Sequence, residues 1–244
     1  MTERDLRILK HIGMYRITLR PILARLYFDG NESAMANVIK RLKAREKGES
    51  EDEDKPVKSS GLIEVRSGLP GNISYYQLTK LGAKQAGVPD DRSKPFGSQA
   101  LNLHLGMLWF CCAGSTKRFR VSDEHFPSFP PGDYCVTGEG SRKLLRVYAP
   151  AATAKRSSIH RAITEQAELL LSHPSTAQPV RDRSVGLAVL VHSSEQGREL
   201  KRAMRSGNGT FGKLHTHLHF VIEVVPSIAT LSGMIHELRS TSPD

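Results

Sequence analysis

Three histidines near the end of the chain stand at every second position. His215, His217 and His219 lie in the segment LHTHLHF. In a β-strand this alternation places side chains on one face, about 6–7 Å apart, and three imidazoles at that spacing can bind one zinc ion. The first question is therefore whether the chain is a metal-dependent hydrolase.

A second interpretation makes the same segment an ordinary strand whose other face is core. That face would carry Leu214, Thr216, Leu218 and Phe220. Only 25 residues follow His219, and they offer Glu223, His236 and Glu237 but no second HxH pair, while His192 is an earlier candidate ligand. We favour the strand without metal, because a catalytic zinc site needs further ligands and a supporting shell. A third interpretation is a pH-sensitive basic surface beside nucleic acid or at a subunit interface.

The charge balance points to a polyanionic partner. The chain has 244 residues, enough for one large or two ordinary domains, with 35 Lys+Arg against 25 Asp+Glu and a net charge of +10. Its sequence pI is about 9.7. A surplus of this size favours nucleic acid, although a merely soluble basic protein is the simpler alternative.

Membrane, export and disulfide chemistry are not indicated. No apolar run approaches the roughly 18 residues that cross a bilayer, and the opening MTERDLRILKH is charged where a signal peptide is apolar. The cysteines Cys111, Cys112 and Cys135 form no CxxC pair. We expect reduced thiols, a cytoplasmic protein and no cofactor.

Apolar residues at helical spacing predict three helices in the first part of the chain. They cover residues 3–12, 16–28 and 33–48. Thr2 with Asp5 forms a capping-box-like start for the first helix, Thr18 is the predicted cap of the second, and Ser33 that of the third. The acidic run 46–60 that follows has no apolar period and predicts a disordered insertion or a long loop.

Two alternating segments separated by GLPGN predict a hairpin, and a short helix follows it. The strands cover residues 61–67 and 73–79, and the helix, which Thr79 caps, covers 80–87. Three helices followed by a two-stranded hairpin are typical of the winged helix, a DNA-binding domain whose third helix enters the major groove. We therefore predict a winged-helix domain over residues 1–90 and a linker over 91–97.

The predicted DNA-binding residues lie on the third helix and on the hairpin. They are Ser33, Asn37, Lys40, Arg41, Lys43, Arg66 and Asn72. On the third helix the polar residues fall opposite the apolar face that Met35, Val38, Ile39 and Leu42 form. The alternative is that this polar face is only solvated, and the helix order, the hairpin and the charge together favour DNA.

Residues 98–244 predict an α/β domain, so the fold class is an α+β winged helix followed by α/β. The predicted helices are 98–114, 157–173, 195–207 and 228–240, and the predicted strands are 118–122, 132–138, 143–150, 185–193 and a long strand at 213–226. The run VGLAVLVHS is apolar throughout, as expected for a central strand.

The first half resembles the replication-relaxation family of plasmid and mobile-element proteins. The resemblance rests on TERDLRILKHIGMYRITLRPILARLYF and on the closing SYYQLTKLGAKQAG, and it continues more faintly at LNLHLGMLWF. It covers about 90 residues well. It implies a role in plasmid replication, mobilisation or transcription control, and a second domain with a degenerate restriction-endonuclease-like fold.

Such a nuclease fold would need paired carboxylates for Mg²⁺. Asp133 stands where the resemblance implies the first carboxylate, but the next strand has Arg146 and Tyr148 where an acid and a lysine belong, and Glu139 lies in a turn. LHTHLH also resembles the opening metal motif of the polymerase-and-histidinol-phosphatase hydrolases, without their later ligands. We therefore predict an inactive second domain.

The first functional hypothesis is thus sequence-specific or structure-specific binding of double-stranded DNA without catalysis. A metal-dependent nuclease or hydrolase in the second domain is the alternative. A third is an adaptor whose second domain dimerises or binds replication or mobilisation proteins.

Overall fold

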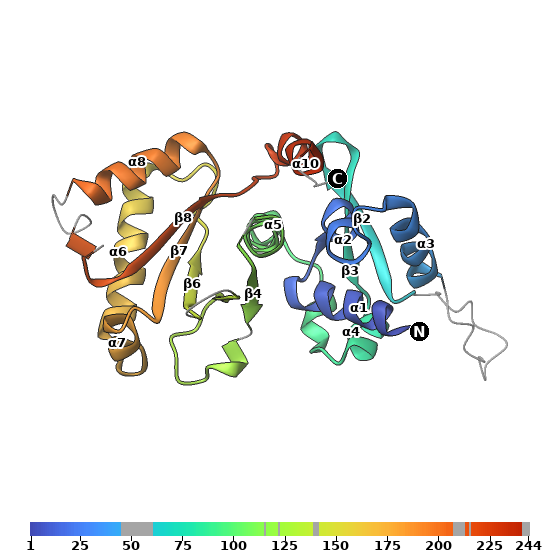
Figure 1. The fold of residues 1–244 in the computed structure, drawn as a ribbon, viewed down its shortest axis with the longest axis horizontal. Helices are drawn as coiled ribbons and strands as arrows, with labels where there is room; N and C mark the ends of the chain where they lie inside the picture. The colour runs from blue at the N-terminus through green and yellow to red at the C-terminus, as the bar shows by residue number, and fades with distance from the viewer. Residues whose placement is uncertain are drawn as a thin grey trace. The chain divides into compact units, whose positions relative to one another are not determined.

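The structure is a computed structural model, which describes residues 1–44, 61–114, 116–121, 123–138, 142–206, 213–214 and 216–240. The acidic segment 46–60 lies outside the described residues. The chain is α+β and divides into two compact units (Figure 1). Unit 1 comprises Met1–Ser98 and Leu231–Asp244, and unit 2 comprises Gln99–Thr230. In the part of the chain that the structure describes, no helix has both the length and the apolar character to cross a membrane.

Unit 1 begins with three helices whose starts follow from their capping residues. The helices are α1 (Glu3–Tyr15), α2 (Arg20–Tyr27) and α3 (Glu32–Lys43). The capping box at α1 is confirmed: the Asp5 N–H donates to Thr2 Oγ1, and the Thr2 N–H donates to Asp5 Oδ2 at 2.9 Å. The prediction for α3 is wrong by two residues, since Asn31 Oδ1 accepts from the Ala34 N–H at 2.9 Å and Ser33 lies inside the first turn.

The prediction that Thr18 caps α2 is also wrong. Thr18 belongs to a two-residue strand, β1 (Thr18–Leu19), and is fully buried. Its hydroxyl lies 3.0 Å from His11 Nε2, so it satisfies a buried imidazole instead of a helix end. Leu19 is the N-cap residue of α2 and has no capping side-chain hydrogen bond.

His11 makes the stability of unit 1 sensitive to acid. Burial lowers the pKa of His11 from 6.5 to about 3, so the unfolded chain takes up the proton first as the pH falls. The stabilisation is fully present above pH 6.5 and is lost between pH 6.5 and 3. We expect His11 to cost about 2 kcal/mol of unfolding free energy between pH 6.5 and 5, measured by urea denaturation. In His11→Gln this part of the pH dependence should vanish; an unchanged pH slope would contradict the assignment to His11.

A three-stranded antiparallel sheet and a short helix complete this part of unit 1. The strand order is β1-β3-β2, with β2 (Ile63–Leu69) and β3 (Ile73–Leu78) joined by the turn Pro70–Asn72, and α4 (Lys80–Ala86) follows. The predicted hairpin and the cap Thr79, whose Oγ1 accepts from the Gly82 N–H, are confirmed. One sheet face, with Ile63, Leu78 and Tyr76, packs on the helices.

Two further segments of unit 1 pack against its helices and sheet. The predicted linker is not loose, because Asp90–Ser93 forms a 3-10 helix, Gln77 donates to the Lys94 carbonyl at 2.8 Å, and Phe96 stacks on Tyr75. The last helix, α10 (Leu231–Ser240), contacts α2 and the turn Pro70–Asn72. We assigned this helix to the second domain by sequence order, whereas it belongs to unit 1.

Unit 2 contains a five-stranded mixed sheet. Its order is β4 (Arg118–Val121), β5 (Tyr134–Thr137), β6 (Leu144–Tyr148), β7 (Val185–Val191) and β8 (His219–Val224). The first three strands are antiparallel and the last three parallel. The helices are α5 (Ser98–Cys112), α6 (Arg156–Ser172), α7 (Pro174–Arg181) and α8 (Ser194–Arg205), and α5 lies on the sheet face opposite α6 and α8 (Figure 1). Every residue of β7 is buried, as predicted for a central strand.

The predicted long strand at 213–226 is wrong in its first half. Lys213–Leu214 and Thr216–His217 are helical, and β8 begins only at His219. Leu214 and Leu218 are both buried and four residues apart, and the Leu218 N–H donates to the Leu214 carbonyl at 3.1 Å. Thr216, on the supposed core face, is exposed. The apolar pattern thus follows a helical turn and not strand alternation.

Candidate functional site

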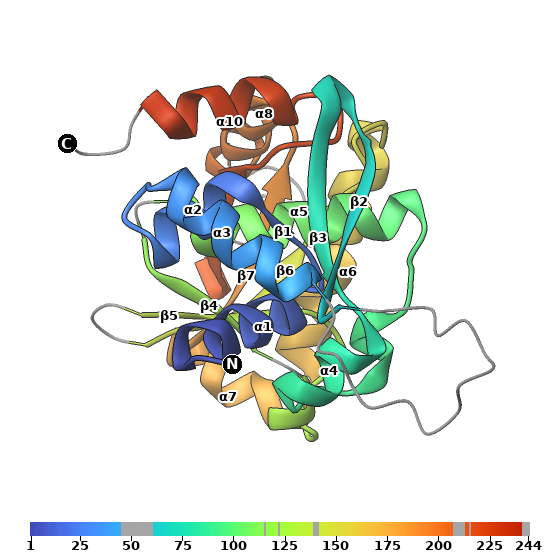
Figure 2. The ribbon, with the colours of Figure 1, turned by 90° about the vertical axis from the view of Figure 1, so that its right-hand side faces the viewer.

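The exposed face of α3 carries the predicted polar residues. Met35, Val38, Ile39 and Leu42 are buried in the core of unit 1, and the predicted residues Ser33, Asn37, Lys40, Arg41 and Lys43 are all exposed. Figure 2 shows α3 beside the β2–β3 hairpin. The segregation arises because the apolar residues recur every three or four positions, which turns the intervening residues outward.

Lys40 and Lys43 line a pocket of about 190 Å³ between α3 and β3. Arg20 of α2 and Tyr76 of β3 line the same pocket. Burial raises the pKa of the Tyr76 phenol, so its hydroxyl remains a hydrogen-bond donor at neutral pH. Arg20 is paired with Glu32 at 3.1 Å, whereas neither lysine takes part in an ion pair within the described ranges. Sequence patterns do not point to Arg20 or Tyr76, because they join this pocket only through the packing of α2 and β3 on α3.

Arg41 is exposed, but it also stabilises unit 1 through an ion pair. Its Nη2 bonds Oδ1 of Asp5, a carboxylate that is only 1% exposed. Burial alone would raise the pKa of Asp5, but hydrogen bonds from Thr2 and Arg41 outweigh it and lower that pKa. Removing Arg41 would leave a buried charge without its partner, so it is an unsuitable residue for testing ligand binding alone.

The two predicted hairpin residues do not join the α3 surface. Arg66 pairs in register with Tyr75, on the sheet face opposite Val65 and Tyr76, and its Nε donates to Glu64 Oε1 at 2.8 Å. Asn72 is exposed in the turn that α10 contacts, with a left-handed φ of 56°. Arg66 points away from the α3 surface because neighbouring positions of a strand point to opposite faces of the sheet.

The histidine motif forms no metal centre in the described residues. His217 is exposed, His219 is half-buried at the start of β8, and His215 lies outside the described residues. His217 is helical and His219 begins a strand, so these two residues do not share the single strand face that the prediction requires. No group of three His, Cys, Asp or Glu side chains in the described parts of the chain could hold a metal. His192 Nε2 is bonded to the Pro150 carbonyl at 3.0 Å.

The residues discussed for a nuclease site are engaged elsewhere. Asp133 Oδ1 accepts from Arg120 Nη2 at 2.6 Å. Arg146 is buried and donates to Gln166 Oε1 at 2.6 Å, to the Pro130 carbonyl and to the Tyr134 hydroxyl. Glu139 lies outside the described residues. Asp133 and Arg146 therefore support the packing of unit 2.

No family model matches the chain, and no curated protein and no solved structure matches it either. Its function is therefore inferred from the residues, their geometry and the resemblance described above.

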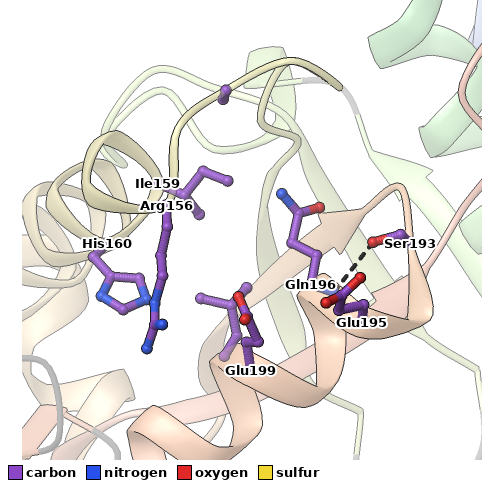
Figure 3. Close-up of a pocket in the computed structure, with 9 residues that line it drawn as sticks. Arg156, Ile159, His160, Ser193, Glu195, Gln196 and Glu199 are labelled. Atoms are coloured by element: carbon purple, nitrogen blue, oxygen red, sulfur yellow. Dashed lines mark hydrogen bonds between the residues drawn. The ribbon is translucent and has the colours of Figure 1, made fainter.

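A pocket of about 240 Å³ opens in unit 2 where α6 and α8 begin (Figure 3). Arg156 and His160 of α6 lie opposite Glu195 and Glu199 of α8, and the Gln196 N–H donates to Ser193 Oγ at 3.1 Å. Burial lowers the pKa of His160, Arg156 lowers it further and Glu199 opposes this. The pocket lies after strands β6 and β7, where sheets of this kind often bind ligands. With His160 neutral, one arginine stands against two glutamates, so the lining is negative by one charge and does not favour an anion.

Proposed function

We propose that unit 1 is a winged-helix domain that binds double-stranded DNA with α3 in the major groove. The order α1-β1-α2-α3-β2-β3 and the sheet order β1-β3-β2 support this proposal, because the winged helix consists of three helices and a hairpin. The α2–α3 pair is the helix-turn-helix part, and Gly30, with a φ of 81°, lies in the turn between its helices.

The observation that carries the proposal is the pair Lys40 and Lys43 on the outer face of α3. Both are exposed at the C-terminal end of a helix whose opposite face is anchored in the core. Lysines placed in this way can contact phosphates while Ser33 and Asn37, also exposed on α3, reach base edges. The favourable interaction of lysines with a helix C-terminus accounts for their presence on α3 but not for the basic charge of the whole chain.

The resemblance to the replication-relaxation family supports a more specific proposal. We propose that the DNA is a plasmid or another mobile element, and that binding serves its replication, mobilisation or transcription. No catalysis is proposed for unit 1.

Salt dependence of duplex binding tests the proposal. With about four phosphate contacts, affinity for a labelled duplex should fall roughly a hundredfold between 50 and 200 mM salt. Fluorescence anisotropy with a mixed-sequence duplex gives the dissociation constant at each salt concentration, and a mixed-sequence single strand serves as the comparison. Absence of binding at 50 mM salt, or affinity that salt does not change, would contradict duplex binding.

A further inference from the structure

A second pocket in unit 2 is lined by positive side chains. It has a volume of about 300 Å³ and lies between the C-terminal half of α8 and the start of β8. Lys201 and Arg205 reach it from α8, Arg183 from the turn before β7, and His219 from the first position of β8. No carboxylate lines it among the described residues.

Among the described residues, the positive charge in this pocket has no counter-ion. Arg183, Lys201 and Arg205 take part in no ion pair within the described segments of the chain. Lys201 and Arg205 are one helical turn apart, a like-charge spacing that destabilises a helix. Lys and Arg near the end of α8 suit the helix dipole, but Arg183 comes from a different element, so the dipole does not explain the cluster. An uncompensated cluster of this kind attracts an anion.

The backbone at Arg183 adds a separate observation. Its φ is 55°, in the left-handed region that glycine and asparagine adopt more easily than other residues. Its N–H donates to the Val180 carbonyl at 3.0 Å, which fixes the turn that ends α7. A non-glycine residue in this conformation is strained, and such strain is often found at functional sites.

Apolar side chains also line the pocket, beside the basic ones on α8 and around His219. Met204 and Leu218 are buried, and Phe220 is half-buried. Burial, assisted by nearby Lys143 and Arg183, lowers the pKa of His219, so the imidazole is neutral above pH 6.5 and one of its ring nitrogens is a hydrogen-bond donor. The pocket therefore combines cations, a neutral donor and apolar surface suited to an apolar or planar group.

We propose that this pocket binds a nucleoside phosphate. The phosphate would contact Arg183, Lys201 and Arg205, and the base would lie against Met204, Leu218 and Phe220. A volume of about 300 Å³ is at the lower end for small-molecule sites and suits one nucleotide. A duplex does not fit, because its bases are stacked inside the helix. The nucleotide is either free or an unpaired nucleotide of a strand. The pocket lies in unit 2 and does not depend on the function proposed for unit 1.

Calorimetric titration of the whole protein tests this site with four probes: ATP, a five-nucleotide DNA single strand, inorganic phosphate and octanoate. ATP, the single strand or both should bind at least tenfold more tightly than phosphate and octanoate. Binding of ATP assigns a free nucleotide, and binding of the single strand alone assigns an unpaired nucleotide of a strand. Phosphate bound as tightly as both nucleotide probes, octanoate bound more tightly, or no binding of any probe would overturn the proposal.

Variants separate this site from general basic charge. Arg183→Gly and Arg205→Ala should each weaken nucleotide binding about tenfold, since each removes one phosphate contact. Arg202→Ala is the matched control, because Arg202 is an exposed arginine of the same helix outside the pocket, and it should change affinity less than about twofold. Glycine adopts the left-handed conformation easily, so Arg183→Gly should have the same thermal unfolding midpoint as the unchanged protein.

Weakening of nucleotide binding by Arg202→Ala as large as that by the two pocket variants would overturn the proposal. Variants of α3 should leave nucleotide binding unchanged, so this site and duplex binding can fail separately.

Discussion

Reversing Lys40 and Lys43 together, as Lys40→Glu with Lys43→Glu, is expected to weaken duplex binding by roughly a hundredfold or more at 50 mM salt. Each substitution removes one phosphate contact and places a negative charge beside the DNA backbone. Both side chains are exposed and take part in no ion pair among the described residues, so the fold should tolerate the change. Anisotropy with a labelled duplex measures the effect, and circular dichroism checks the fold.

The matched control makes a charge change of the same size on another helix of unit 1. Lys80 and Lys84 are exposed on α4, and Lys80→Glu with Lys84→Glu shifts the net charge by the same amount. This pair should weaken duplex binding several times less than the α3 pair. If both pairs weakened binding equally, the attraction would be diffuse and α3 would not be the DNA-reading helix. Arg41 is left unchanged in both variants because of its bond to Asp5.

Gly82→Ala is expected to destabilise the protein by about 3 kcal/mol or more. An ideal Cβ at Gly82 would overlap the carbonyl oxygen of Leu62, a backbone atom that cannot rotate away. Either α4 or the start of β2 would have to move, with the cost of overpacking a core. Helix propensity alone predicts that Gly82→Ala stabilises the protein, because alanine favours a helix by about 1 kcal/mol over glycine. Urea denaturation of the whole protein gives the unfolding free energy.

Gly233→Ala in α10 provides the comparison. No atom of another described segment lies within 4 Å of a Cβ placed there. Helix propensity should therefore act alone and stabilise the protein by about 0.5–1 kcal/mol. If Gly82→Ala were as harmless as Gly233→Ala, the close approach of α4 to Leu62 would not exist in solution.

Local signals in the sequence predict much of unit 1, because they need only neighbouring residues. Thr2 with Asp5 and Thr79 cap their helices through hydrogen bonds three residues away. The turn formers around Gly71 indicate the hairpin. The buried and exposed faces of α3 follow from its apolar period, so most of the candidate DNA-binding residues could be chosen from the sequence.

Errors occur where the partner is distant or the period is ambiguous. Thr18 has the side chain of a cap, but a buried imidazole seven residues earlier takes its hydroxyl. Leu214 and Leu218 fit both a strand and a helical turn, and hydrogen bonding selects the turn. The pocket around Arg183 joins three segments widely separated in sequence, and no local pattern predicts that convergence.

The return of α10 to unit 1 makes unit 2 a guest domain inserted in a host. The chain leaves the host at Ser98 and re-enters it at Leu231, so two covalent crossings connect the units. A single proteolytic cut at either crossing would not release the guest.

The same arrangement governs how the host can be produced on its own. A fragment that stops at Ser98 lacks Arg239, which bonds Glu32 at 2.9 Å, and lacks the helix that covers α2 and the tip of the hairpin. A minimal fragment for testing duplex binding should therefore join residues 1–98 to 231–240 through a short linker in place of the guest.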